Sequence, residues 1–215
     1  GPNIPRMLGL DHLPPTAEGE KAEPAEIRGM KVVSIGFLVQ DGQPLIWRGP
    51  MLHSAIKQFL TDFNWGKLDY LVVDMPPGTG DVQLSISQSL PVSGAVIVTT
   101  PQQVAVDDAY RAVSMFEKLN VPVLGIVENM AYLNLPAGTK LHVFGEAGGK
   151  NLASRLDVPF LGSVPMDPEI ARAGDIGSPL ISREEQSDVT EAFYEAAENV
   201  AAQLSIRSFK IVDAE

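Results

Sequence analysis

The sequence predicts an α/β fold with a mainly parallel sheet and helices on both faces. Short runs of β-branched and apolar residues, of the length of buried strands, alternate with segments whose apolar residues recur every three or four positions. Such alternation implies right-handed crossovers between parallel strands. The chain has 215 residues without an evident linker or internal repeat, so we expect a single domain over 1–215.

The predicted strands follow a stretch without periodicity. Residues 11–30 are rich in Pro, Glu and Ala, and we expect them to form a surface loop. Near-continuous apolar runs then favour strands buried on both faces. These runs cover residues 31–39, 69–74, 94–100 and 121–127, with a shorter one at 158–164.

The predicted helices are recognised by apolar stripes with helical spacing. The stripes consist of Leu52, Ile56, Phe59 and Phe63; of Ala109, Val113, Phe116 and Leu119; and of Val189, Phe193, Ala197, Val200 and Leu204. Ser182, followed by Glu184 and Glu185, resembles a capping box and is expected to open the last helix.

Composition and charge exclude several classes of function. The formal net charge is −11, which argues against a surface for nucleic acid or anionic lipid, because both need clustered Lys and Arg. The longest apolar runs are too short to span a bilayer, and we expect a cytoplasmic protein. The sequence contains no cysteine, so these residues cannot form a disulfide or a Cys-ligated zinc or iron–sulfur site. The three histidines are scattered singly and are not expected to bind metal.

The most informative segment is 69-DYLVVDMPPGTGD-81. A hydrophobic strand that ends in an aspartate, here Asp74, is the Walker B pattern, in which the carboxylate holds Mg²⁺, often through a water. The following Pro-Pro-Gly-Thr-Gly stretch cannot extend the strand, and its glycines permit backbone N–H groups to point at a γ-phosphate. The alternative is an ordinary turn from strand to helix, with Asp81 as the N-cap.

The segment 74-DMPPGTGD-81 resembles the switch II motif of the Mrp-type P-loop ATPases, which are nucleotide-dependent iron–sulfur cluster carriers. The resemblance extends in both directions and covers nearly the whole chain. Matching segments follow in the family's order at 99–111, 125–130, 144–153 and 164–180, and residues 1–10 look like the segment after the family's switch I aspartate.

The resemblance implies a P-loop NTPase-like fold that binds ATP and Mg²⁺, and it assigns the site residues. Asp74 would bind Mg²⁺ through a water and serve catalysis, while Pro77, Gly78 and Gly80 would lie on the γ-phosphate side. Asn129 would hydrogen-bond adenine, and Pro165 and Asp167 would line the base pocket. Two alternatives stay open: Asn129 as the cap of a helix or turn, and Asp167 as the N-cap of a helix that begins at Pro168.

The sequence departs from the family in its phosphate loop. No G-x-x-x-x-G-K-[ST] string occurs in the 215 residues, and we reject the nearest stretch, 144-FGEAGGKN-151, as a phosphate site. The family carries this loop on its first strand, upstream of the segment that opens this chain. We therefore expect a chain truncated at its N-terminus that lacks the first strand, and we expect it alone to be marginally stable, prone to associate and inactive as an ATPase.

The second departure concerns the iron–sulfur cluster. Leu135 and Gly138 stand where the family's Cys-x-x-Cys pair is expected, and neither offers a ligand. A [4Fe-4S] cluster is thus implied by the resemblance alone.

Three functional hypotheses follow. The leading one is a nucleotide-switched homodimer that serves iron–sulfur client apoproteins and binds neither nucleic acid nor membrane. The others are a partitioning ATPase like ParA or MinD, against which the acidic last helix and the net charge count, and a non-enzymatic scaffold that keeps the fold and binds a protein partner.

Overall fold

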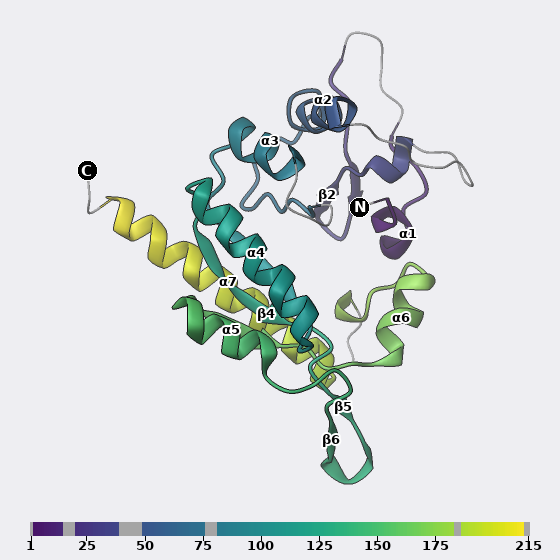
Figure 1. The fold of residues 1–215 in the computed structure, drawn as a ribbon. Coiled ribbons are helices and arrows are strands. Elements are labelled where there is room, and N and C mark those ends of the chain that lie inside the picture. Colours follow the sequence, from purple (N-terminus) through teal and green to yellow (C-terminus); the bar gives the residue numbers. More distant parts are fainter. Residues whose placement is uncertain (1, 15–19, 39–48, 76–80, 183–185, 213–215) are drawn as a thin grey trace. The chain divides into compact units, whose positions relative to one another are not determined.

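The computed structural model describes residues 2–14, 20–38, 49–75, 81–182 and 186–212 (Figure 1). The chain divides into two compact units. The first comprises residues 1–90 and 169–182, and the second comprises residues 91–168 and 183–215.

The second unit is built on a parallel sheet. Its strands are β3 (Ala95–Thr99), β4 (Val123–Glu128) and β7 (Phe160–Ser163), in the order β3-β4-β7. They coincide with the strands predicted at 94–100, 121–127 and 158–164. The central strand β4 is buried along nearly its whole length, but β3 alternates between buried and exposed side chains, with Val98 61% exposed. The expectation that every strand is buried on both faces was therefore wrong for β3.

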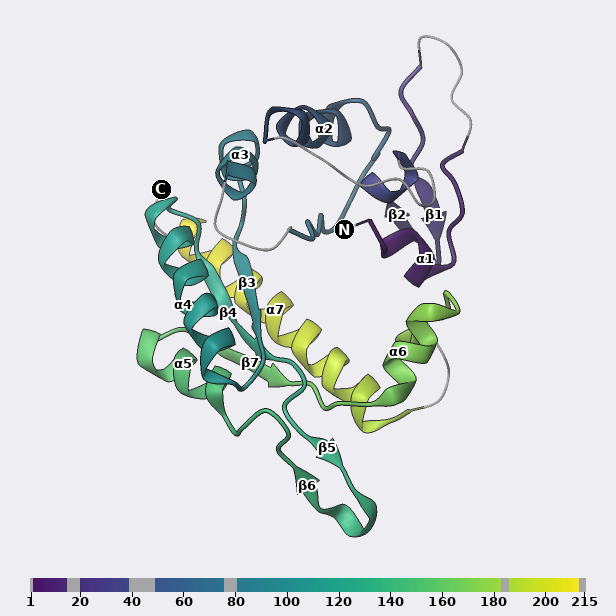
Figure 2. The same cartoon turned by 45° about the vertical axis from the view of Figure 1, so that its right-hand side comes forward.

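Helices cover both faces of this sheet (Figure 2). On one face lie α4 (Gln103–Lys118) and α5 (Gly148–Leu156), whose Val113 and Leu152 form a buried cluster with Ile97 and Ile126. On the other face lies α7 (Asp188–Val212), whose Ala196 packs in a second cluster with strand and loop residues of the sheet. The Asn199 amide of α7 also donates a hydrogen bond of 3.0 Å to the carbonyl oxygen of Leu161. The predicted α/β architecture is thus confirmed.

Helix α7 faces the sheet with a different stripe from the predicted one. Val189 and Ala196 are buried and Ala192 and Val200 are half-buried, whereas Phe193 and Ala197 are exposed. Two stripes with acceptable helical spacing run along this helix. The observed stripe uses small alanines, which let the helix approach the sheet closely.

The start of α7 also differs from the prediction. The Ser187 hydroxyl accepts the Thr190 N–H at 3.2 Å, while the Thr190 hydroxyl accepts the Ser187 N–H at 2.8 Å. This reciprocal cap places the helix start after Ser187, where both partners are correctly spaced. Ser182 belongs instead to a 3-10 turn, η3 (Leu180–Ser182), so the capping box expected there was wrong.

The first unit contains a β-hairpin within the predicted loop. β1 (Ala25–Ile27) pairs antiparallel with β2 (Met30–Val32), and the connecting Arg28 and Gly29 both have positive φ, 49° and 75°. Two such residues in succession make the tight turn that suits hairpins. The expectation of an irregular loop over all of 11–30 was therefore wrong for its last third.

The strand predicted at 31–39 ends early. The Ser34 hydroxyl accepts the N–H of Gly36 at 3.0 Å, and the chain turns into the 3-10 helix η1 (Ile35–Leu38). A side chain that bonds the backbone two residues on offers an alternative to the strand ladder, which explains the break.

The remaining helices of the first unit are α1 (Ile4–Leu8), α2 (Gly49–Thr61), α3 (Asp81–Ser89) and most of α6 (Pro168–Asp175). α2 confirms the helix predicted from the stripe that begins at Leu52. None of the helices that the structure describes is both long and apolar enough to cross a membrane.

The strand predicted at 69–74 is not formed. The structure describes these residues and assigns them neither strand nor helix, and Val72 is 88% exposed. A strand forms only where a neighbour takes up its N–H and C=O groups. The three strands of the parallel sheet pair with one another, and no described strand includes or pairs with residues 69–74. The prediction was wrong because an apolar run alone does not supply that neighbour.

Candidate functional site

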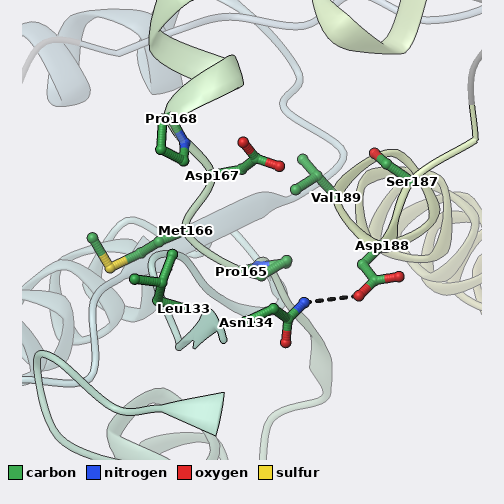
Figure 3. Close-up of a pocket in the computed structure, with 9 residues that line it drawn as sticks. All are labelled: Leu133, Asn134, Pro165, Met166, Asp167, Pro168, Ser187, Asp188 and Val189. Carbon is green, nitrogen blue, oxygen red and sulfur yellow. Dashed lines mark hydrogen bonds between the residues drawn. The ribbon is translucent and has the colours of Figure 1, made fainter. Parts of the chain in front are cut away.

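A cavity of about 410 Å³ lies beyond the carboxyl ends of β4 and β7, within the second unit (Figure 3). This volume is in the range of roughly 300–1,000 Å³ that small-molecule pockets occupy. In parallel sheets this edge is where ligands bind. The lining residues come from three segments: Leu133 and Asn134; Pro165, Met166, Asp167 and Pro168; and Ser187, Asp188 and Val189.

Two of these segments are held together by backbone hydrogen bonds beyond the ends of their strands. The Ala131 N–H donates to the Val164 carbonyl oxygen at 3.0 Å, and the Met166 N–H donates to the Tyr132 carbonyl oxygen at 2.7 Å. Leu133 and Met166 then form an isolated parallel bridge. The chain after β4 therefore runs beside the chain after β7, and the cavity wall is built on hydrogen-bonded backbone.

The wall formed by Leu133 and Asn134 belongs to a second hairpin. β5 (Leu133–Asn134) pairs antiparallel with β6 (Lys140–Leu141), and a 3-10 turn, η2 (Pro136–Gly138), joins them. At the base of this hairpin the Lys140 ammonium lies 3.7 Å from the centre of the Tyr132 ring, a cation–π contact.

A side-chain hydrogen bond connects this hairpin to α7. The Asn134 Nδ2 donates to Asp188 Oδ2 at 2.7 Å, across 54 positions of sequence, and both residues line the cavity (Figure 3). Neither residue was predicted from the sequence. Asn134 lies in a short strand that carries no clear periodicity, and Asp188 is one of several acidic residues on the last helix.

Pro165 and Asp167, which were predicted to line the base pocket, both line the cavity. Pro165 is fully buried, and Asp167 is half-buried directly before α6, which begins at Pro168. That position agrees with the alternative in which Asp167 is an N-cap. A single carboxylate can stand before a helix and face a cavity, so the two roles are compatible.

Asn129 follows β4 directly but is not among the residues that line the cavity. Its N–H donates to the Thr99 carbonyl oxygen at 2.7 Å, and its Oδ1 accepts the Met130 N–H at 3.0 Å. Met130 has a φ of 54°, so the Asn129 side chain stabilises a left-handed turn. This is the turn-capping role that the sequence analysis left open, and it leaves the Asn129 amide nitrogen for other contacts.

Of the remaining predicted site residues the structure describes Asp74, which lies in the first unit. Asp74 is exposed and follows residues 70–73, which form neither strand nor helix. Pro77, Gly78 and Gly80 lie outside the described residues, and α3 begins directly after them at Asp81.

The stretch 144–151, which the sequence analysis rejected as a phosphate loop, leads into α5. The N–H of Gly149 in the first turn donates at 2.6 Å to Oε2 of Glu128, a buried carboxylate at the end of β4. A methyl group on Gly148 would lie 2.1 Å from the Pro101 carbonyl oxygen. The protein thus supplies its own anion to this helix N-terminus and packs backbone against it, which speaks against a phosphate there.

The residues in hand do not fit an iron–sulfur cluster. The 215 residues include no cysteine, and the described residues contain no group of three or more His, Asp or Glu side chains placed to hold a metal ion. Leu135 is partly exposed near the tip of the β5–β6 hairpin, and Gly138 ends η2 with a φ of 78°. Neither can replace a thiolate.

Comparison with known proteins places the chain in a family. Residues 1–201 match the family model described as NUBPL iron-transfer P-loop NTPase. The chain belongs to this family. It is 49% identical over 210 residues to the iron–sulfur cluster carrier protein of Deinococcus radiodurans, covering 97% of this chain and 59% of that protein. It is 47% identical over 205 residues to the iron–sulfur cluster transfer protein NUBPL of Mus musculus, covering 95% of this chain and 64% of that protein.

Solved structures agree with this placement. A nucleotide-binding protein from Archaeoglobus fulgidus, solved in complex with ADP, superposes with a TM-score of 0.72 at 36% identity, over 90% of this chain and 75% of that one. The cell division ATPase MinD of Pyrococcus furiosus superposes with a TM-score of 0.51 at 22% identity, over 72% of this chain and 59% of that one, and it shares the fold. The P-loop NTPase-like fold and the membership of an iron–sulfur carrier family, both predicted from the resemblance to the Mrp-type ATPases, are therefore confirmed. This chain spans about 60% of the length of the two curated relatives named above.

Proposed function

We propose that this NUBPL-family chain binds an adenine nucleotide, with the base in the cavity between the β5–β6 hairpin, the loop after β7 and the start of α7. The observation that carries the proposal is that Pro165 and Asp167, both expected to contact the base, line one cavity at the carboxyl edge of the sheet. The ADP bound to the relative from Archaeoglobus fulgidus supports the ligand class.

The charge of the cavity favours a base over a phosphate group. Asp167 and Asp188 are among its lining residues, and none of the nine is Lys, Arg or His. Carboxylates repel phosphate oxygens and accept hydrogen bonds from the N–H groups of a base. Apolar side chains from Leu133, Met166 and Val189 complete the walls and suit a flat ring.

The chemical step in this proposal is ATP hydrolysis in the intact protein. Asp74 would hold Mg²⁺ through a water, and Pro77, Gly78 and Gly80 would lie against the γ-phosphate. Mg²⁺ would neutralise charge on the transferred phosphoryl group. Binding of ATP would close a homodimer, and hydrolysis would open it again. The protein would act in the cytoplasm, and its partners would be iron–sulfur apoproteins.

The cluster itself enters only as cargo. The family's name and the relatives' names support a role in iron–sulfur transfer. These 215 residues include no cysteine, so they offer no thiolate, and any cluster would have to be held by other ligands.

Calorimetric titration of the 215-residue chain with ADP tests the proposal. Asp167→Ala is expected to weaken binding about fivefold, the equivalent of one hydrogen bond of about 1 kcal/mol. Asp175→Ala, at the exposed far end of the same helix α6, is the matched control and should bind like the wild type. Absence of ADP binding by the wild-type chain would refute the proposal and favour a scaffold that keeps the fold without the nucleotide.

A further inference from the structure

The Asn134–Asp188 pair has a geometry that goes beyond closing the cavity. Asn134 comes from β5, and Asp188 is the first residue of α7. The amide nitrogen of Asn134 donates to Asp188 Oδ2 at 2.7 Å. This bond fixes the orientation of the carboxylate, because Asp188 Oδ2 can satisfy the bond only in a narrow range of rotamers.

The backbone beneath Asp188 is also fixed. The flanking Ser187 and Thr190 form the reciprocal cap that starts α7, and Val189 is buried against the sheet. The cap therefore fixes the backbone at Asp188, and the hydrogen bond from Asn134 holds the Asp188 carboxylate at the cavity wall. A preorganised acceptor of this kind discriminates between ligands more sharply than a mobile side chain does.

We infer that Asp188, positioned by Asn134, is a specificity-determining residue that accepts a hydrogen bond from the exocyclic amine of a purine base. A carboxylate can accept a second hydrogen bond from an N–H donor of the base, and a base without such a donor leaves Asp188 with the hydrogen bond from Asn134 alone. The inference rests on the proposed function, since it concerns the base that the same cavity would hold.

Nucleosides are the appropriate probes, since they test the base site without any phosphate contact. Adenosine and purine riboside differ only in the 6-amino group. The expected difference in Kd is about tenfold in favour of adenosine, the value of one hydrogen bond to a charged acceptor at an exposed site. Titration of the ¹⁵N-labelled 215-residue chain, followed by its amide spectrum, gives both Kd values. The side-chain NH₂ signals of Asn134 report directly on the pair.

Three variants sharpen the test. Asp188→Ala is expected to weaken adenosine binding to the level of purine riboside and to leave purine riboside unchanged. Asn134→Ala, which removes only the positioning group, should weaken adenosine binding less. Glu191→Ala is the matched control, because Glu191 is the other acidic residue in the first turn of α7, is exposed and does not line the cavity.

The outcomes separate the inference from the proposed function. Equal Kd values for the two nucleosides in the wild-type chain would overturn the inference and leave base binding intact. The same holds if Glu191→Ala loses as much adenosine affinity as Asp188→Ala. If neither nucleoside shifts any signal of the cavity residues, both the inference and the proposed base site fail. The amide spectrum of each variant shows whether it is folded.

Discussion

Replacement of Glu128 tests how the end of β4 is held next to Asn129. Glu128 is only 3% exposed, and its Oε2 accepts the N–H of Gly149 at 2.6 Å. In Glu128→Ala the buried Gly149 N–H loses this acceptor, which costs about 1–3 kcal/mol. Loss of one buried methylene group adds about 0.8 kcal/mol. The free energy of unfolding should therefore fall by about 2–4 kcal/mol.

Glu128→Gln separates the hydrogen bond from the charge. The glutamine carbonyl oxygen can still accept the Gly149 N–H, so only the charge-assisted part of the bond is lost. We expect a decrease of about 1 kcal/mol, the difference between a charged and a neutral hydrogen bond. Glu117→Ala, an exposed position near the end of α4, is the control and should change stability by less than about 0.5 kcal/mol.

Urea unfolding followed by far-ultraviolet circular dichroism measures these differences by linear extrapolation. The expected order of stability is wild type, then Glu128→Gln, then Glu128→Ala. An alanine variant as stable as the wild type would refute the reasoning. That result would mean that removing a carboxylate from the interior recovers as much free energy as the hydrogen bond provides.

Ala196→Asp buries a charge and should lower the free energy of unfolding by more than about 2 kcal/mol in the same urea assay. Ala197→Asp, on the exposed side of α7, should change it little, and equal effects of the two substitutions would contradict the orientation of α7. Gly148→Ala should lower stability by about 1–3 kcal/mol through its 2.1 Å contact with a backbone oxygen, whereas Gly174→Ala, whose added methyl meets only ordinary contacts, should not. The 215-residue chain should release phosphate from ATP far more slowly than an intact relative; equal rates in a phosphate-release assay would show that it needs no G-x-x-x-x-G-K-[ST] loop.

The parts of the fold that were predictable are those in which local pattern and tertiary environment agree. The strands at 95–99, 123–128 and 160–163 carry β-branched residues and lie in a sheet covered by helices, so the apolar run and the burial have the same cause. The segment 69–74 has the same kind of run but no described strand partner. Hydrophobic pattern specifies a tendency to be buried, and a partner strand decides whether a ladder forms.

The candidate site was predictable to the extent that its residues lie in one stretch of sequence. Pro165 and Asp167 follow a strand and precede a helix that starts with proline, and this local order identified them. Asn134 and Asp188 are 54 positions apart and meet only because the hairpin after β4 folds back toward the start of α7. No spacing rule connects such residues, so their contact required the structure.

The starts of α5 and α7, both in the second unit, differ in what they leave for a ligand. At α5 the first-turn N–H of Gly149 is already bound by Glu128, and Gly148 packs against the Pro101 backbone. At α7 the cap is internal, and the Asp188 carboxylate faces a cavity. A phosphate is therefore disfavoured at both helix starts. At α5 the Glu128 carboxylate already accepts the first-turn N–H, and at α7 the carboxylates of Asp167 and Asp188 line the cavity. Phosphate recognition is accordingly expected elsewhere, and the sequence-based candidates for it are Pro77, Gly78 and Gly80, next to an Mg²⁺ held by Asp74.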